Sequence, residues 1–508
     1  VVTTGDASVD ATTDDATDTV TSGTITLNVT GAGDVGLNGA NALTVGSATV
    51  TNESSANESA TVGDIVVTSA DAVNNGTAGD PLDVSFGTAN GSSTNTAGVL
   101  AVTTDGTGAA GEIRITTAEA LTLGVLDTQD ADATAVDISV TGDDVLLTLR
   151  DASALDDDVV NLAADNMDIA NTLTSTGIVT LAPESVADAD DLIDLGGADA
   201  ANTLGLTNTE LNNITASTLR IGDGAAGAIT LSADISPATV ADVHLLTGAG
   251  ITGAAGGIDV VTGLAITANG VVNITDANTE FTNLSVANAG NDVTIVETDG
   301  FAVGDVDALQ GVSGADIVLT ASAGGLSVTN GGAANDIDAS GTVALTAGGD
   351  DQLLTIAAGA NVQGTGGAHS YTADNMDLAG TVTATAQTVT LAPESVADAG
   401  DLIDLGGADA ANTLGLTNTE LNNITTTTLV IGGTTGTLST TASLTPANVT
   451  NVTLIADNMN LANALDATGG IVTLAPESVA DAGDLIDLGG ADAANTLGLT
   501  NTELNNIT

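Results

Sequence analysis

The densest potential chemistry in the chain is a cluster of carboxylates that follows a proline and occurs three times. The first cluster lies in PESVADADDLID at 183–194, and the others lie at 393–404 and 476–487. Aspartate and glutamate supply the hard oxygen ligands that Ca²⁺ takes, at roughly six to eight per ion. The sequence therefore predicts candidate calcium ligands at Glu184, Asp188, Asp190, Asp191, Asp194, Glu394, Asp398, Asp401, Asp404, Glu477, Asp481, Asp484 and Asp487.

Solvated turn carboxylates are the alternative interpretation of these clusters. None of them has the spacing of an EF-hand loop. The nearby GGADAANTL at 196–204 matches the calcium-binding nonapeptide GGxGxDxUx only in part, because Asp199 replaces a Gly and Ala201 replaces the ligand Asp. Calcium is thus the one cofactor that the sequence suggests, and both interpretations stay open.

The overall charge restricts the partners. The chain has 66 acidic residues against three basic ones, Arg114, Arg150 and Arg220, which gives a formal net charge of −63. Such a charge repels phosphate backbones and anionic lipid headgroups. We therefore expect no nucleic-acid partner and no direct binding to anionic membranes.

An enzyme is the less favoured class. Parallel β-helices can carry polysaccharide lyases and hydrolases, and paired carboxylates can cleave glycosides. With 66 acidic residues, however, chance pairs are common, and only three arginines could stabilise an acidic sugar. His244 and His369 stand alone in the sequence, where we expect surface or turn histidines. The sequence predicts no catalytic residue and leaves a polysaccharide-active β-helix enzyme as a minor alternative.

The elements that would position these side chains belong to long internal repeats. TLAPESVADAGDLIDLGGADAANTLGLTNTELNNIT occupies 390–425 and 473–508, and a copy with one substitution occupies 180–215. Each copy follows a short preface, such as ADNMDIA at 164–170. The complete repeat blocks, 164–222, 373–432 and 456–508, belong to a solenoid segment at 161–508, which follows more divergent solenoid coils at 1–160. Offsets between copies lie near multiples of 21 residues, the size of one coil of a β-solenoid.

Local patterns agree with a solenoid. TITLNVT at 24–30 alternates apolar and polar residues, which is typical of a strand with one buried face. Aromatic residues are 1% of the chain and cysteine is absent, whereas 43% of residues are hydrophobic, which favours a narrow aliphatic β core. In LTNTELNNIT, Thr207 and Glu210 have capping-box spacing, which predicts a helical turn at a corner. We expect an all-β parallel β-solenoid with coils of about 20–21 residues, forming one continuous elongated rod.

The repeats resemble a known family. ADNMDLAGTVTATAQTVTLAP, IDLGGADAANTLGLTNTELNNIT and NDVTIVETDGFAVGDVDALQGVSGADIVLTA are similar to repeats of filamentous-haemagglutinin-like exoproteins, many of which are exported by two-partner secretion. The resemblance covers 160–508 and, less distinctly, 1–160. It implies a right-handed parallel β-helix, an extracellular or cell-surface location, and a role in adhesion or biofilm structure. It implies no catalytic residues, and the basic patches of a heparin-binding adhesin are absent.

The expected function is that of a non-enzymatic extracellular structural rod, an adhesin-like stalk or filament subunit at a bacterial surface. A calcium-dependent surface-layer or biofilm-matrix component is the alternative. The third copy stops at Thr508, where the other two continue into TLRIG and TLVIG. We therefore expect either that the protein is much longer or that its ends meet in an assembly. The expected partners are further copies joined end to end, or other surface proteins and glycans.

Overall fold

The computed structural model describes most of the chain, in several segments. These are residues 2–3, 7–10, 19–29, 42–45, 47–51, 59–69, 82–86, 89–90, 94–104, 112–128, 135–155, 159–184, 191–332, 336–394, 402–433, 436–467, 469–477, 485–493 and 496–508. The chain divides into two compact units, Val1–Ala249 and Gly250–Thr508.

The first unit begins with coils of four strands. These strands are β1 (Val2–Thr3), β2 (Ala7–Asp10), β3 (Thr19–Thr21), β4 (Ile25–Val29), β5 (Ala42–Val45), β6 (Ala48–Thr51), β7 (Ser59–Thr61), β8 (Ile65–Ser69), β9 (Leu82–Phe86), β10 (Ala89–Asn90), β11 (Thr94–Thr96) and β12 (Leu100–Thr104). Every fourth strand pairs in parallel, so that β1, β5 and β9 form one ladder and β4, β8 and β12 another. The predicted alternation at 24–30 corresponds to β4.

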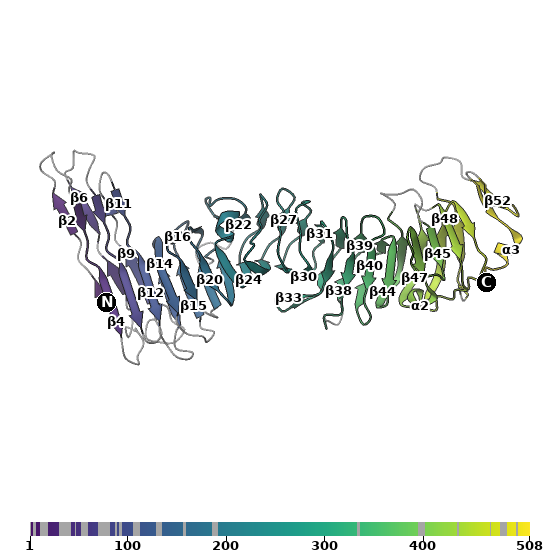
Figure 1. The fold of residues 1–508 in the computed structure, drawn as a ribbon, viewed down its shortest axis with the longest axis horizontal. Helices are drawn as coiled ribbons and strands as arrows, with labels where there is room; N and C mark the ends of the chain where they lie inside the picture. The colour runs from purple at the N-terminus through teal and green to yellow at the C-terminus, as the bar shows by residue number, and fades with distance from the viewer. Residues whose placement is uncertain are drawn as a thin grey trace. The chain divides into compact units, whose positions relative to one another are not determined.

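The rest of the first unit contains the first repeat block. Its elements are β13 (Ile113–Thr117), β14 (Leu121–Thr128), β15 (Ala135–Val140), β16 (Leu146–Leu149), β17 (Ser153–Leu155), β18 (Val159–Ala163), β19 (Asn166–Ile169), β20 (Leu173–Ser175), β21 (Ile178–Ala182), β22 (Leu192–Leu195), β23 (Thr203–Leu206), α1 (Asn208–Leu211), β24 (Ile214–Gly222), β25 (Ile229–Leu231) and β26 (Val240–Thr247). Parallel ladders stack these strands side by side (Figure 1).

The second unit contains the other two blocks. Its elements are β27 (Ile251–Gly253), β28 (Gly263–Ala268), β29 (Val272–Ile274), β30 (Asn283–Asn288), β31 (Val293–Glu297), β32 (Phe301–Val303), β33 (Asp305–Val306), β34 (Leu309–Gln310), β35 (Val312–Gly314), β36 (Ile317–Ala321), β37 (Leu326–Val328), β38 (Ile337–Ala339), β39 (Val343–Ala347), β40 (Leu353–Ile356), β41 (Asn361–Gly364), β42 (His369–Thr372), β43 (Asn375–Leu378), β44 (Thr381–Ala392), β45 (Leu402–Leu405), β46 (Thr413–Leu416), α2 (Asn418–Leu421), β47 (Ile424–Gly432), β48 (Thr437–Thr440), β49 (Val449–Ile455), β50 (Asn458–Asn460), β51 (Val472–Ala475), β52 (Leu485–Leu488), β53 (Thr496–Leu499) and α3 (Asn501–Leu504). Strands β33 and β34 form an antiparallel hairpin, whereas the ladders that join neighbouring coils, such as β31 with β36 and β36 with β39, are parallel.

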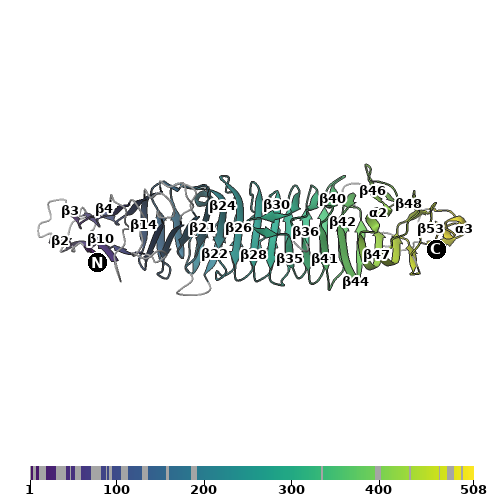
Figure 2. The same cartoon turned by 90° about the horizontal axis from the view of Figure 1, so that it is seen from below.

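The core of each unit consists of stacked rows of aliphatic side chains. In the first unit Val136, Val160 and Val179 are paired from coil to coil, and all three are fully buried. The inward residues alternate with outward ones along each strand, as the sequence pattern predicts. Figure 2 shows the same stacking of strands from below. The prediction of an all-β parallel β-solenoid is confirmed.

Coil length is less uniform than the predicted 20–21 residues. Bonds between neighbouring coils join residues 19 apart at Glu184 and 26 apart at Thr342. Near the amino end of the first unit the separation is 41, between Gly63 and Ser22. Within the first block it is 40, between Ser217 and Gly177. The repeat block therefore contains one long coil, which includes the short strands β22 and β23 and the helical turn α1.

No helix in the described segments is long and apolar enough to cross a membrane.

Candidate functional site

The helical turn of each block has the predicted capping box. Thr207 precedes α1 with an extended backbone, and its hydroxyl accepts a hydrogen bond from the Glu210 N–H. In return, Glu210 Oε2 accepts bonds from the Thr207 N–H at 2.9 Å and from the Thr207 hydroxyl at 2.7 Å. The same box recurs in the second block at Thr417 and in the third at Thr500. The capping-box prediction is confirmed in every copy.

The capping glutamate also contacts a strand far away in the sequence. Glu210 Oε1 accepts a hydrogen bond from the backbone N–H of Ile169 in β19, at 3.2 Å. Asn213, just after the turn, donates from Nδ2 to the carbonyl oxygen of Ile169 at 2.7 Å. Glu210 and Asn213 thus provide hydrogen-bond partners for both the N–H and the carbonyl oxygen of Ile169, on the edge of β19.

Asp199 accepts a hydrogen bond from the backbone N–H of a second residue on the same edge of β19. Its Oδ2 accepts from the Met167 N–H at 3.1 Å, and its Oδ1 accepts from the Gly205 N–H in β23 at 2.9 Å. The carboxylate therefore bridges β19 and β23. Gly205 has no room for a side chain, since a Cβ there would lie 2.0 Å from the carbonyl carbon of Ala198.

Together these three side chains replace a rung of the β ladder. Strand β19 pairs with β16 along one edge. Its other edge bonds to the side chains of Asp199, Glu210 and Asn213, here called the edge latch. The latch recurs with the same partners in the later blocks, at Asp409, Glu420, Asn423, Asp492, Glu503 and Asn506. Each block thus closes its long coil with side chains where a strand would otherwise pair.

An open cavity lies beside the latch. In the first block it measures about 470 Å³, and its lining includes Asp168, Asp199 and Glu210. The corresponding cavity of the third block measures about 430 Å³, with Asn460 in place of Asp168. The cavity thus recurs with one less carboxylate. The latch carboxylates on its wall already accept backbone N–H groups, which gives them a structural role.

Burial shifts the acidity of the latch aspartates. Partial burial raises the pKa of Asp199 from 3.8 to about 6, and the nearby charges of Glu210 and Asp168 act in the same direction. Its two backbone hydrogen bonds oppose the shift. The pKa of Asp409 is raised to about 6 as well, mainly by burial, with its backbone hydrogen bonds opposing.

These shifts predict a pH dependence of stability. A carboxyl whose pKa is raised on folding binds more protons in the folded state, so stability falls as pH rises from 3.8 to about 6 and then levels off. After allowance for solvent screening, we expect roughly 1 kcal/mol per latch aspartate. Urea unfolding between pH 4 and pH 7 measures the slope. The Asp199→Asn and Asp409→Asn variants are expected to flatten it, and an unchanged slope in both variants would contradict the prediction.

The predicted calcium ligands are only partly described. Glu184 and Asp191 are buried, and the Glu184 N–H donates to Asp165 Oδ1. Asp194 is half-buried, and its equivalent Asp404 accepts a bond from the Thr441 hydroxyl at 2.6 Å. Glu394, Glu477 and Asp487 are also placed, whereas Asp188, Asp190, Asp398, Asp401, Asp481 and Asp484 lie outside the described residues. The placed residues alone do not bring three acidic or histidine side chains into a metal-binding group. The calcium site therefore stays a prediction.

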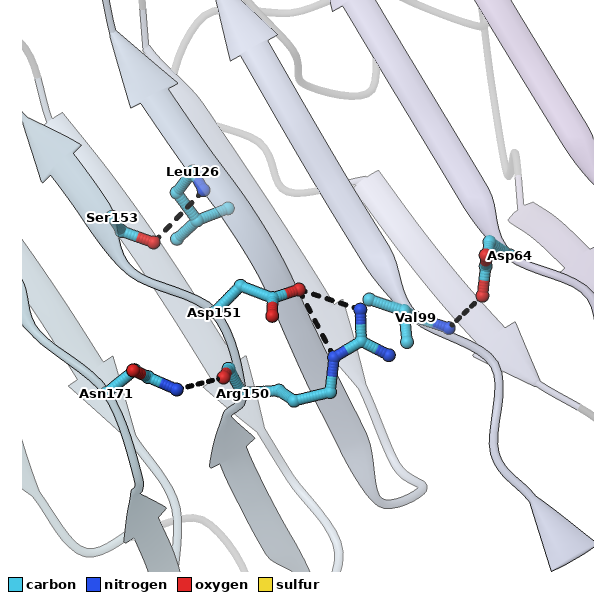
Figure 3. A network of polar contacts seen from close by, with 7 residues as sticks. All are labelled: Asp64, Val99, Leu126, Arg150, Asp151, Ser153 and Asn171. Atoms are coloured by element: carbon cyan, nitrogen blue, oxygen red, sulfur yellow. Dashed lines mark hydrogen bonds and ion pairs between the residues drawn. The ribbon is translucent and has the colours of Figure 1, made fainter.

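Arg150 and Arg114 take part in ion pairs. Arg150 Nη2 lies 2.7 Å from Asp151 Oδ2, and Figure 3 shows this guanidinium directed at the neighbouring carboxylate. The same view shows how coils are joined, with Asn171 bonded to the Arg150 carbonyl and Ser153 accepting the Leu126 N–H. Arg114 pairs with Glu112 and Asp137. The pair of Arg114 with Asp137 joins neighbouring coils, because β13 pairs with β15, whereas Arg150 and Asp151 are adjacent in the sequence and exposed.

The expectation of surface or turn histidines is wrong. His369 is fully buried in β42, between Val343 and Val389 of the neighbouring coils, and His244 is 5% exposed in β26. His369 Nδ1 lies 2.9 Å from the buried Tyr371 hydroxyl, and burial lowers the pKa of the imidazole to about 4. The alternating pattern of β42 directs His369 inward. His244 is buried on the other face of β26, since the core positions there are Val243 and Leu245.

The chain matches no family model, no curated protein and no solved structure.

The edge latch is the site that sequence reasoning missed. Asp199 and Asn213 are identical in all three blocks, yet Asp199 was assessed only as a poor match to a calcium motif. The available signal was the strict spacing of Asp199, Glu210 and Asn213 in each copy.

Proposed function

We propose that the chain is a non-enzymatic structural protein, an adhesin-like stalk or filament subunit at a bacterial cell surface. The observation that carries the proposal is the edge latch, repeated in three blocks with the same partners. A block that closes its own long coil can be duplicated without disturbing the coils on either side. The latch carboxylates, which are identical in all three blocks, accept hydrogen bonds from backbone N–H groups, and this is a structural role.

The proposed location and partners come from composition and resemblance. A net charge of −63 suits a soluble extracellular surface that repels nucleic acids and anionic lipids. The repeats resemble those of filamentous-haemagglutinin-like exoproteins, which implies secretion. Partners on this proposal are further copies joined end to end, or other surface proteins and glycans.

Immunogold electron microscopy of the native cells tests the proposal. We expect labelled fibres, a lattice or projections at the cell surface. Label confined to the cell interior would contradict it.

A calcium-dependent surface-layer or matrix component is the second candidate. One observation favours it, because Asp194 Oδ1 is buried with no hydrogen-bond partner among the described residues. A bound cation would compensate that oxygen. On this candidate, chelation by EGTA is expected to lower the melting temperature, and Asp194→Asn is expected to remove most of the difference. An identical melting temperature with and without chelator would eliminate it.

A further inference from the structure

Two polar side chains interrupt the aliphatic core of the second unit. Parallel pairing stacks the strands β31, β36, β39, β42, β44 and β47 in that order (Figure 2). One row of inward side chains along this stack consists of Val293, Ile317, Val343, His369, Val389 and Leu429. The row beside it consists of Ile295, Leu319, Leu345, Tyr371, Leu391 and Ile431. The coil at β42 thus places a histidine and a tyrosine in two rows that are aliphatic on both sides.

Both polar side chains are completely enclosed. His369 and Tyr371 are each 0% exposed, and His369 Nδ1 lies 2.9 Å from the Tyr371 hydroxyl. The other ring nitrogen, Nε2, has no hydrogen-bond partner among the described residues. Gly364, at the end of β41, packs against this nitrogen, since a Cβ there would lie 2.2 Å from Nε2. The imidazole therefore has one hydrogen bond and an unpaired nitrogen in a closely packed core.

The strands around the imidazole carry no charge that would compensate a proton on it. Strands β39, β41, β42 and β44 contain no acidic residue and no basic residue other than His369. Burial keeps the one tyrosine among them, Tyr371, neutral by raising its pKa. Asp316 and Asp374, next to β36 and β42, accept hydrogen bonds from backbone N–H groups, and Asp338 of β38 is exposed. A proton on His369 would thus be a buried charge without a partner.

We propose that His369 is an acid-sensitive switch, and that protonation of its imidazole opens the coil at β42 from the neighbouring strands β39 and β44. A protonated imidazole is a donor at both nitrogens and carries a charge, which water solvates and an aliphatic row does not. Opening admits water to Nε2. It also breaks ladder bonds such as the one from the Val343 N–H to the carbonyl oxygen of Ala368, 3.2 Å long and next to the histidine.

The direction of the pKa shift gives the pH window of this switch. Burial lowers the pKa of His369 from 6.5 to about 4, so the open coil binds more protons than the closed coil between these values. Opening is therefore rarest above pH 6.5, increases as the pH falls, and levels off below about pH 4. We expect the opening equilibrium to increase by about 100-fold across this window. Asp409 of the same unit acts in the opposite direction, so variants are compared at each pH.

Hydrogen exchange in the full chain tests the proposal. After correction for the intrinsic exchange rate at each pH, protection of the Val343 amide is expected to fall by about 100-fold between pH 6.5 and pH 4. The matched control combines His369→Leu with Tyr371→Phe, which makes both rows aliphatic, and it is expected to lose this pH step. Tyr371→Phe alone retains the imidazole and is expected to retain the step. This pair of variants assigns the response to the histidine.

A titration by nuclear magnetic resonance gives a second readout on the unaltered chain. The sequence contains two histidines, so isotope-labelled histidine gives two imidazole signals. The signal that disappears in His369→Leu belongs to His369. We expect that signal to keep its neutral position until the pH approaches about 4. This readout does not depend on whether the double variant folds.

Three results would overturn the proposal. A His369 signal that titrates near pH 6.5 would mean that water reaches the imidazole in the closed coil. Constant protection of Val343 down to pH 4 would mean that the coil tolerates the proton. An equal loss of protection in the unaltered chain and in the double variant would assign the acid response to another group. None of these results bears on the cell-surface proposal, which immunogold labelling tests separately.

Discussion

Replacing Leu405 with Ala is expected to destabilise the unit Gly250–Thr508 by about 2–5 kcal/mol, whereas Leu488→Ala is expected to change its stability by less than about 0.5 kcal/mol. Leu405 is fully buried beneath the neighbouring coil, and the equivalent Leu488 is 69% exposed. Truncation at Leu405 removes buried methyl groups and leaves a cavity that stacked strands cannot close easily. Urea denaturation monitored by circular dichroism measures both changes.

The pair of variants is its own control. Because both leucines lie in the same LIDLGGADAANTL sequence, strand propensity and unfolded-state effects cancel between them. Equal losses at the two positions would contradict the prediction and would mean that the face of the third block is covered in solution. Hydrogen exchange in β45 and β52 then shows whether each loss is local.

The strand pattern was readable from the sequence because it depends on neighbours along the chain. Alternation of Ile25, Leu27 and Val29 predicts a half-buried strand, and β4 occupies that segment. The parallel stacking also followed from the repeats, since each block must bury one face against its neighbours. The coil length was less predictable. The offset between copies counts whole coils and does not reveal that one coil of each block takes 40 residues, as the bond from Ser217 to Gly177 shows.

Only the local part of the candidate site could be predicted from the sequence, because the rest depends on contacts between coils. The capping box of Glu210 joins residues three apart, so its spacing is visible in the sequence. The second bond of Glu210 reaches Ile169, 41 residues away, and depends on the register of the folded coils. The buried histidine is a similar case. His369 takes an inward position of β42 and stacks on Val343 of β39, a partner 26 residues away that the sequence around the histidine does not identify.

Replacing Glu420 with Ala is expected to destabilise the same unit by about 2–4 kcal/mol. Its carboxylate accepts bonds from the Thr417 N–H and hydroxyl, and from the Leu378 N–H at 3.3 Å. The substitution removes the cap of α2 and leaves the Leu378 N–H on a strand edge without an acceptor. Glu420→Gln is expected to retain part of the stability, because the amide oxygen can still accept from one side. Urea denaturation gives the loss of stability.

Residue-level hydrogen exchange distinguishes loss of the latch from general unfolding. In Glu420→Ala, exchange at Leu378 is expected to accelerate more than at Met376, whose N–H donates to Asp409. Glu280→Ala, at an exposed glutamate of the same unit, is the matched control and is expected to change neither amide. If the two amides accelerate equally, Asp409 and Glu420 act as one cooperative unit. If neither accelerates, the strand edge is held by something other than the latch, and the observation that supports a duplicated scaffold block is lost.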